Sequence, residues 1–238
     1  SEKIEDRFNL DKGMGATIEI FGDGTQGMVG TAFIYTNKEH ISIGCGALLS
    51  QMSQKRIRPY ELLEYIKKHP VIKPLIAGGE PCEYYAHLIP EGGYKSIPKL
   101  VGDGVLVVGD AAQFVNGIHR EGSNMGMTSG RLAAETIINA KKSGQFDRNA
   151  LSKYETMIKN SYVIKDLYKY KDASSTMEEN PRFFNNYIPA ANKLLNKMRT
   201  VDGVAKADKQ KSGFAYFTEG NSKLGFAKDM IKIWRAMK

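Results

Sequence analysis

The order of apolar and polar residues predicts three β-strands within residues 14–47. The segments alternate or are rich in β-branched and aromatic residues, and they are MGATIEI (14–20), GMVGTAFIYT (27–36) and HISIGCGA (40–47). Three residues, 37–39, separate the last two segments, which is the length of a hairpin connection. We therefore expect antiparallel strands that belong to one sheet.

The pattern then changes to the period of a helix. Residues 59–69 begin with a proline that suits the first helical position, carry an apolar stripe and stop before Pro70. A further strand is expected at CEYYAHLIP (82–90). The continuously apolar run GVLVVGD (104–110) predicts a strand buried on both faces, as in a parallel sheet.

The second half of the chain has a mainly helical pattern. One helix is expected from about Ser123 to Ala140, and irregular helices from Leu151 onward, with breaks at residues 180–181 and at Pro189. The polar stretch 201–213 predicts a loop. The final helix has four apolar residues on one stripe: Leu224, Ala227, Ile231 and Trp234.

Residues 22–27 match the GxGxxG pattern, but their context argues against a dinucleotide site. Such a fingerprint must follow a strand and open a helix, whose N-terminus receives the pyrophosphate. Here the glycines lead into the strand-like residues 27–36. We expect a plain turn between strands.

The segment 104–130 has the context of a ligand site. Asp110 follows an apolar strand, at the edge where open α/β sheets bind ligands, and an ionised carboxylate can accept hydrogen bonds from sugar-alcohol hydroxyls. The small residues Ala111 and Ala112 keep the turn narrow. Gly117 and Gly122 would let the backbone come close to a ligand.

The helix that follows strengthens this interpretation. Ser123 is a plausible N-cap, and the first turn offers free N–H groups and the positive end of a dipole. Several small residues predict a flat partner packed closely on this helix, either backbone or a planar ring: Gly126, Ser129, Gly130, Ala133 and Ala134. The alternative is a buried strand–loop–helix crossover without a ligand.

Composition excludes several other classes of protein. The chain is 42% hydrophobic and 25% charged, which is ordinary for a soluble globular protein. Two cysteines, Cys45 and Cys82, cannot form an iron–sulfur cluster or zinc ribbon by themselves, and reduced thiols of a cytoplasmic protein are expected. The four histidines lack metal-ligand spacing, so no metal site is predicted, and no residue is singled out as catalytic.

Positive charge is concentrated in the C-terminal part. Residues 1–140 hold 14 Lys and Arg against 16 Asp and Glu, whereas residues 141–238 hold 20 against 10. Such a segment suits an acidic partner, an anionic membrane surface or nucleic acid, and a solvated helical face is the simpler alternative.

Residues 109–112 (GDAA) with the downstream Gly122, Ser123 and Asn124 resemble the second FAD motif of glutathione-reductase-type flavoproteins. More narrowly, the chain resembles the FixC group, relatives of electron-transfer-flavoprotein:quinone oxidoreductase. Three stretches in order carry this likeness: TQGMVGTAFIYTNKEHISIG, AHLIPEGGYKSIPKLVGDGVLVVGDAA and the helix that follows. The segments YVIKDLYKYKDA and ENPRFF extend the resemblance over most of the chain.

The resemblance implies an α/β (α+β) protein with a truncated FAD-binding fold. An antiparallel catalytic sheet would occupy residues 1–100, the second part of the FAD-binding domain residues 101–145, and a basic, mainly helical region residues 146–238. Relatives begin with a strand–GxGxxG–helix unit that binds the ADP half of FAD. Since this chain has no such unit, we expect that half to lie upstream and this stretch alone to be inactive.

The resemblance also implies a cofactor site. Asp110 would hold the ribityl chain of FAD, and the backbone from Gly122 to Met125 would lie beside the pyrimidine edge of the flavin. The residues expected to bind FAD are Gly109, Asp110, Ala111, Ala112, Gly117, Gly122, Ser123, Asn124 and Met125. Further candidates for lining the flavin are Tyr35, Tyr84, Tyr85 and His87.

The implied function is electron transfer between an electron-transfer flavoprotein and a quinone or ferredoxin. Expected partners are the electron-transfer-flavoprotein subunits and a small ferredoxin-like protein. The basic C-terminal region is an expected contact with that protein or a membrane surface, in a cytoplasmic or peripheral protein. One alternative is a geranylgeranyl-reductase-type flavoenzyme that saturates isoprenoid lipids, although FIYT at residues 33–36 differs from the Trp-x-Phe-Pro common there. Another is a non-enzymatic basic binding module, for which no nucleic-acid motif is present.

Overall fold

The computed structural model describes residues 4–238 and divides them into two compact units. The first contains residues up to Ala86 together with Asn180–Ala227, and the second contains His87–Glu179 with Lys228–Lys238. The mixture of helices with small antiparallel sheets confirms the α+β class. The division into residues 1–100, 101–145 and 146–238 stays a prediction.

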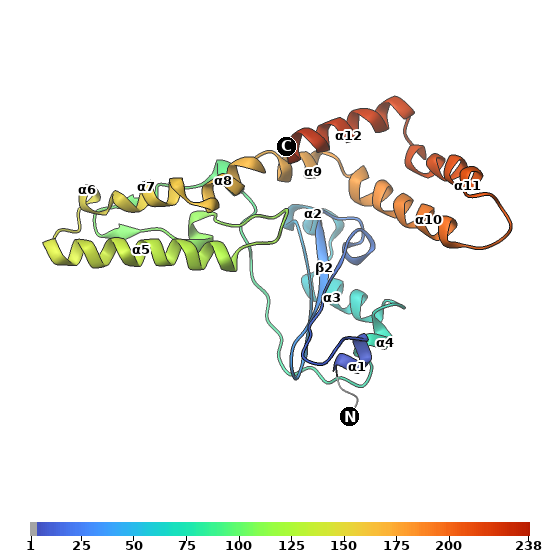
Figure 1. Ribbon diagram of the computed structural model, residues 1–238, viewed down its shortest axis with the longest axis horizontal. Helices are drawn as coiled ribbons and strands as arrows, with labels where there is room; N and C mark the ends of the chain where they lie inside the picture. The colour runs from blue at the N-terminus through green and yellow to red at the C-terminus, as the bar shows by residue number, and fades with distance from the viewer. Residues whose placement is uncertain (1–3) are drawn as a thin grey trace. The chain divides into compact units, whose positions relative to one another are not determined.

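The first unit contains the three-stranded antiparallel sheet that the alternation predicts. Its strands are β1 (Thr17–Ile20), β2 (Gly30–Thr36) and β3 (Ile41–Ala47), in that order (Figure 1). Ala32 and Ile34 of β2 are fully buried on one face, while Phe33 and Tyr35 stack on the other with ring centroids 4.6 Å apart. This period of two follows from the pleat of a strand.

Short helices accompany this sheet. They are α1 (Ile4–Phe8), α2 (Leu49–Lys55), α3 (Pro59–Lys68) and α4 (Lys73–Ile76). The predicted α3 has Pro59 in its first turn and buries Leu62 and Ile66. The GxGxxG segment forms a 3₁₀ turn, η1 (Asp23–Thr25), between β1 and β2, which confirms that it is a turn between strands.

The prediction of a strand at residues 82–90 is wrong. Residues 79–92 form neither helix nor strand, and Tyr85 and Leu88 are 69% and 82% exposed. A strand needs a hydrogen-bonded neighbour, and within residues 4–238 no segment pairs with this one. The β-prone composition therefore has no sheet to join.

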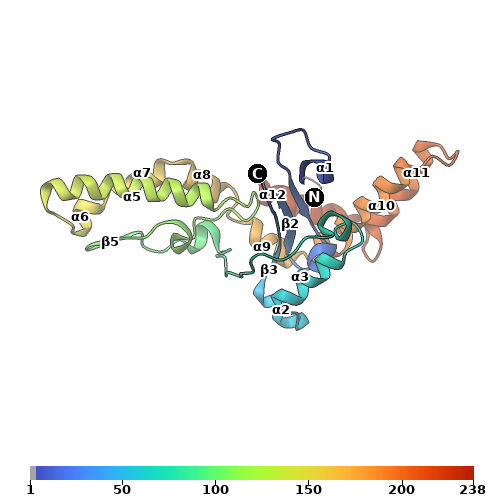
Figure 2. The same cartoon turned by 90° about the horizontal axis from the view of Figure 1, so that it is seen from below.

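The second unit is built around a long helix, α5 (Ser123–Ser143), and its predicted position is confirmed. Seen from below, α7 (Lys153–Asn160) and α8 (Tyr162–Lys169) lie along α5 (Figure 2). The remaining elements are η2 (Gly93–Ser96), η3 (Gly109–Ala112), α6 (Arg148–Leu151) and α9 (Ala173–Glu179).

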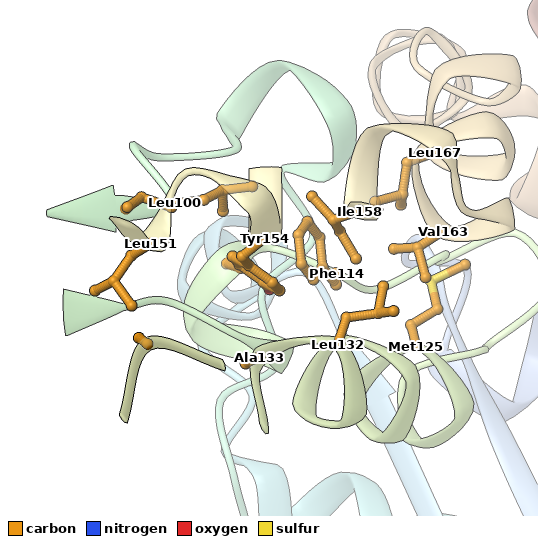
Figure 3. Close-up of a cluster of buried hydrophobic side chains, with 13 residues drawn as sticks. Leu100, Phe114, Met125, Leu132, Ala133, Leu151, Tyr154, Ile158, Val163 and Leu167 are labelled. Carbon is orange, nitrogen blue, oxygen red and sulfur yellow. The ribbon is translucent and has the colours of Figure 1, made fainter. Parts of the chain in front are cut away.

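Apolar side chains from α5, α7, α8 and the preceding loops form the core of this unit. Figure 3 shows the fully buried Tyr154 and Phe114 next to each other, with Phe114 between Leu132 of α5 and Ile158 of α7. Because Phe114 follows η3 closely in sequence, the core also holds that turn against the helices. The turn on which the site depends is therefore anchored by packing.

The parallel strand expected at residues 104–110 is also wrong. The chain forms instead a short antiparallel hairpin of β4 (Val101–Gly102) and β5 (Val105–Leu106), and Val105 is 54% exposed. Burial on both faces requires neighbouring strands on each side. Among the described residues, β4 alone pairs with this run.

The structure of the C-terminal segments corrects two further expectations. These segments are η4 (Phe183–Tyr187), α10 (Ile188–Arg199), α11 (Lys206–Gly213), η5 (Phe214–Thr218) and α12 (Lys223–Met237). The break at residues 180–181 is confirmed, but Pro189 causes no break, because it lies at the start of α10, directly after the π-helical turn η4 with which α10 is continuous. No described helix is both long enough and apolar enough to cross a bilayer.

The predicted loop 201–213 is a helix over its second half, α11. This helix has no apolar stripe, which is why its sequence reads as loop. Lys209, 1% exposed, donates a hydrogen bond of 2.6 Å to the Thr200 carbonyl and forms an ion pair with Asp202. Gly213 lies so close to Leu194 of α10 that an added Cβ would be 2.4 Å from Leu194 Cδ1. Polar anchoring and close contact therefore replace an apolar face.

Candidate functional site

The turn η3 is fixed directly to helix α5. Gly109 has a φ of 55°, in the left-handed region that glycine tolerates best. The Ser129 hydroxyl accepts a hydrogen bond of 3.0 Å from the Gly109 N–H and donates one of 3.0 Å to the Gly126 carbonyl. One side chain thus joins the GDAA turn to the first turns of the helix.

The structure brings the predicted Asp110 and Gly122 together. Asp110 is exposed, and a Cβ placed on Gly122 would lie 4.0 Å from Asp110 Oδ1. Ala111 is also exposed, whereas Ala112 is fully buried in the core. The carboxylate is therefore presented to solvent beside the beginning of α5, from a turn whose other end is anchored.

The beginning of α5 differs from the prediction by one residue. Gly122, not Ser123, occupies the N-cap position, and no side chain caps the helix. The first N–H groups of the helix, around Ser123 to Met125, have no acceptor within the helix. The Met125 side chain is fully buried, so its backbone alone can face the site.

The loop between η3 and α5 is closed on itself. Asn116 and Glu121 exchange backbone hydrogen bonds of 2.9 and 3.2 Å, and Asn116 Oδ1 accepts bonds from the N–H groups of Ile118 and His119. His119 Nε2 also lies 2.9 Å from the Tyr170 hydroxyl, which joins the loop to the end of α8. The loop is thus held at both its base and its tip.

Asn116 is the residue in this loop that sequence reasoning missed. It is 3% exposed, and its Nδ2 has no hydrogen-bond partner. A buried amide without an acceptor is costly and requires an explanation, such as a ligand that completes it. The Asn116–Gly117 pair is a turn signal in the sequence, but only the fold shows that the amide is buried.

The structure gives a reason for glycine at position 117 that the sequence did not reveal. A Cβ at this position would lie 2.3 Å from Glu91 Oε2, so the carboxylate of Glu91 occupies the space of a side chain. Part of Glu91 reaches solvent, yet loss of water around its carboxyl group raises the pKa of that group, and the charge of Arg120 opposes the shift. The role of Gly117 in cofactor binding stays a prediction.

The small residues of α5 leave open space on the helix. Beyond the adjoining residues and backbone of the helix itself, a Cβ added to Gly126 or Gly130 would meet no atom within 4 Å, whereas Ser129 and Ala133 are buried. The flat partner predicted for this helix is therefore not supplied by the described residues at these two glycines. The further lining candidates Tyr84, Tyr85 and His87 lie in the irregular segment 79–92, and Tyr35 lies on β2.

Comparison with known proteins shows the relationships of the chain. It is 47% identical over 237 residues to the protein FixC of Azorhizobium caulinodans. These aligned residues make up 99% of this chain and 54% of that protein. A family model described as the ETF-QO/FixC family C-terminal domain matches residues 173–238. The chain belongs to the ETF-QO/FixC family.

Other members of the ETF-QO/FixC family show similar coverage. Protein FixC of Rhizobium meliloti is 45% identical over 239 residues, which cover 98% of this chain and 55% of that protein. A probable electron transfer flavoprotein-quinone oxidoreductase, YdiS of Escherichia coli, is 38% identical over 204 residues, 85% of this chain and 47% of its own length. The chain spans about half the length of these curated relatives. The resemblance stated from the sequence is confirmed.

Proposed function

We propose that the chain forms part of an FAD-dependent oxidoreductase that transfers electrons between an electron-transfer flavoprotein and a quinone or ferredoxin-like protein. The supporting observation is the turn at Gly109 and Asp110, fixed to the open beginning of α5, with a buried amide nitrogen, Asn116 Nδ2, that has no hydrogen-bond partner in the loop between them. Family membership supports the same conclusion. The residues present fit a flavin cofactor, which supplies the redox chemistry when bound.

Each group of the site has a task in this proposal. Asp110 accepts hydrogen bonds from hydroxyls of the ribityl chain, and Asn116 Nδ2 donates to an acceptor of the cofactor. The N–H groups at Ser123, Asn124 and Met125 would hold the pyrimidine edge of the flavin. The positive end of α5 favours negative charge there by about 1 kcal/mol, equivalent to roughly 40 mV for a one-electron couple.

The hairpin β4–β5 has a place in the same proposal. Val105 is exposed, and the backbone of Val108, directly before η3, is extended. We infer that neighbouring strands come from the part of the family's length that this chain does not cover. This would complete a FAD-binding sheet whose carboxyl edge carries Asp110.

Removal of the Asp110 carboxylate tests the cofactor site. In the complete protein, Asp110→Ala should weaken FAD binding about 10- to 100-fold, the value of hydrogen bonds to a charged group. FAD content after gel filtration, read from flavin absorbance, measures the loss. Asp11→Ala, which removes an exposed carboxylate outside the site, is the control and should retain FAD. Unchanged FAD content in Asp110→Ala would refute the assignment.

The electron-transfer role has its own measurement. Reduced electron-transfer flavoprotein should become oxidised when the FAD-loaded protein and either a quinone analogue or a ferredoxin-like acceptor are present. If the protein binds FAD but transfers electrons to neither acceptor, the proposed cofactor site would still hold, and the proposed partners would be refuted. If the reduced flavin is reoxidised by a geranylgeranyl lipid and by neither of these acceptors, the result would instead favour the alternative of an isoprenoid-reducing enzyme.

A further inference from the structure

Glu91 and the residue after it lie against the loop between η3 and α5. A Cβ placed on Gly117 would be 2.3 Å from Glu91 Oε2 and 3.3 Å from Glu91 Cδ. The next residue, Gly92, is also close to the loop, because a Cβ placed there would lie 2.9 Å from Gln113 Oε1. The end of the irregular segment 79–92 is therefore packed on this loop through a carboxylate and a glycine.

The carboxylate of Glu91 explains a glycine whose backbone does not require one. The φ of Gly117 lies outside the left-handed region, so what this position requires is space. A charged group that has no part in the proposed function fills that space. Its contact with the loop removes water from the carboxylate and raises the pKa of Glu91, while another part of the residue still reaches solvent. A proton can therefore exchange between this carboxyl group and water.

Arg120 supplies the charge that opposes this effect. Its guanidinium group lowers the pKa of Glu91, against the larger effect of the lost water. The other ionisable residues of η2, η3 and the loop are Lys95, Asp110, His119 and Glu121. Lys95 is engaged with Asp172 at 2.6 Å. Lost water and a neighbouring cation thus act in opposite directions on one carboxyl group, so a change of charge beside it can alter its protonation.

Asn116 places this carboxyl group beside the proposed cofactor site. It directly precedes Gly117, and its Nδ2 is the buried donor that we assign to an acceptor of the cofactor. Consecutive Cα atoms are only about 3.8 Å apart. Negative charge that arrives at the site therefore acts on Glu91 over a short distance. A nearby negative charge makes a carboxyl group hold its proton more strongly.

We propose that Glu91 binds a proton when the cofactor site is reduced and releases it when the site is reoxidised. The inference rests on the proposed function, in which the electron-transfer flavoprotein supplies the electrons. On reduction, a proton from solvent forms an O–H bond with a carboxylate oxygen of Glu91. On reoxidation this bond breaks, and the proton returns to solvent. Glu91 itself gains and loses no electrons, and its neutralisation offsets part of the negative charge that the site receives.

A merely structural role for Glu91 has a different consequence. If this side chain only fills the space beside Gly117, glutamine can replace it, because glutamine has nearly the same shape. An amide does not titrate as a carboxyl group does, so glutamine cannot take up the proton. Glu91→Gln therefore separates the two roles.

Proton uptake during reduction tests the proposal. The complete protein with bound FAD is reduced electrochemically in weakly buffered solution that contains a pH indicator. Between the pKa values of Glu91 in the oxidised and reduced protein, Glu91→Gln should take up fewer protons than the wild type, by up to one for every two electrons. Infrared difference spectra should show the carbonyl stretch of a protonated carboxyl group on reduction of the wild type and not of the variant. Glu83→Gln, which removes another exposed carboxylate of segment 79–92, is the control and should behave like the wild type.

Gly117→Ala tests the position of the carboxylate without removing it. The added Cβ would displace the end of the flexible Glu91 side chain into water, so proton uptake should fall toward that of Glu91→Gln. Uptake is counted per bound flavin, so that partial loss of FAD leaves the comparison intact. Full uptake in Gly117→Ala, or equal uptake in the wild type and Glu91→Gln, would overturn the proposal while FAD binding still holds. A complete protein that binds no FAD would refute the proposed function, and this inference with it.

Discussion

Gly109 holds the backbone of the site in a conformation that other residues rarely adopt. Its positive φ aims the N–H group at Ser129, so the conformation and the hydrogen bond to α5 depend on each other. Gly126, on the facing helix, has ordinary helical geometry and open space beside it. The backbone conformation therefore requires glycine at position 109, whereas no contact among the described residues requires it at position 126.

This difference gives a paired prediction. Gly109→Ala should lower the free energy of unfolding by about 1–2 kcal/mol, because a Cβ is strained in the left-handed region. Gly126→Ala should be neutral or stabilise by up to about 1 kcal/mol, because alanine is the better helix former and meets no neighbour. Urea unfolding followed by circular dichroism measures both. Equal effects from the two substitutions would contradict the argument.

At the scale of single residues, the sequence predicts the chemistry of a side chain better than it predicts what surrounds that side chain in the fold. Asp110 and Gly122 were chosen for residue type and context, and the fold places them side by side. Asn116 and Glu91 were missed, and Ser129 was named only as a small residue of the helix, because the significance of all three lies in burial and in contacts with residues distant in sequence. No local pattern distinguishes an asparagine whose amide nitrogen is buried without an acceptor from one that is exposed in a turn.

Tyr154 connects three elements of the second unit. It extends from α7 across the core, where it is fully buried, and its hydroxyl donates a hydrogen bond of 3.0 Å to the carbonyl of Val107, after β5. Burial raises the pKa of Tyr154 to about 12, and a hydrogen bond with Ser129 of α5 opposes that shift. The neutral phenol is thus favoured in the folded state.

The raised pKa predicts a loss of stability in alkali. The unfolded chain releases the phenol proton near pH 10 and the folded chain near pH 12. The stabilisation by the neutral phenol is complete below pH 10 and disappears as the pH rises to 12. It amounts to about 3 kcal/mol for two pKa units.

The variant Tyr154→Phe isolates this contribution. Its free energy of unfolding should be lower than that of the wild type by about 1 kcal/mol at neutral pH, because the Val107 carbonyl loses its donor. Between pH 10 and 12 the wild type should lose stability more steeply than the variant. Tyr84→Phe, which removes an exposed phenol, should keep the wild-type profile. Parallel pH profiles for the wild type and Tyr154→Phe would disprove the coupling.

Among secondary-structure elements, those with local partners could be predicted. The strands of residues 17–47 pair with their sequence neighbours, so alternation alone identifies them. The runs 82–90 and 104–110 have the composition of strands, but a strand also needs partners that composition does not name. α11 was missed for the opposite reason, because it is held by Lys209 and Gly213 rather than by an apolar stripe.

The whole molecule exposes more surface than a compact protein of its mass. Its accessible surface is 15489 Å² for 26.4 kDa. Two separate compact units sharing that mass would expose roughly 13,000 Å² together, whatever their arrangement. Widely exposed apolar side chains contribute to the excess, among them Leu88, Val105 and Met127. Surface of this kind indicates faces that another part of the protein or a ligand covers.

This excess surface leads to a prediction for the chain as a unit. Produced alone, the 238 residues should lose FAD during gel filtration, whereas the complete protein should retain it, because we propose that the missing length supplies the neighbours of β5 and the other half of the cofactor site. The isolated chain should also bind a dye for exposed apolar surface, such as ANS, more strongly per mass than the complete protein. Flavin absorbance and dye fluorescence measure both effects on the same samples. Stoichiometric FAD on the isolated chain would show that residues 109–125 and their surroundings suffice, and would refute the need for a second half.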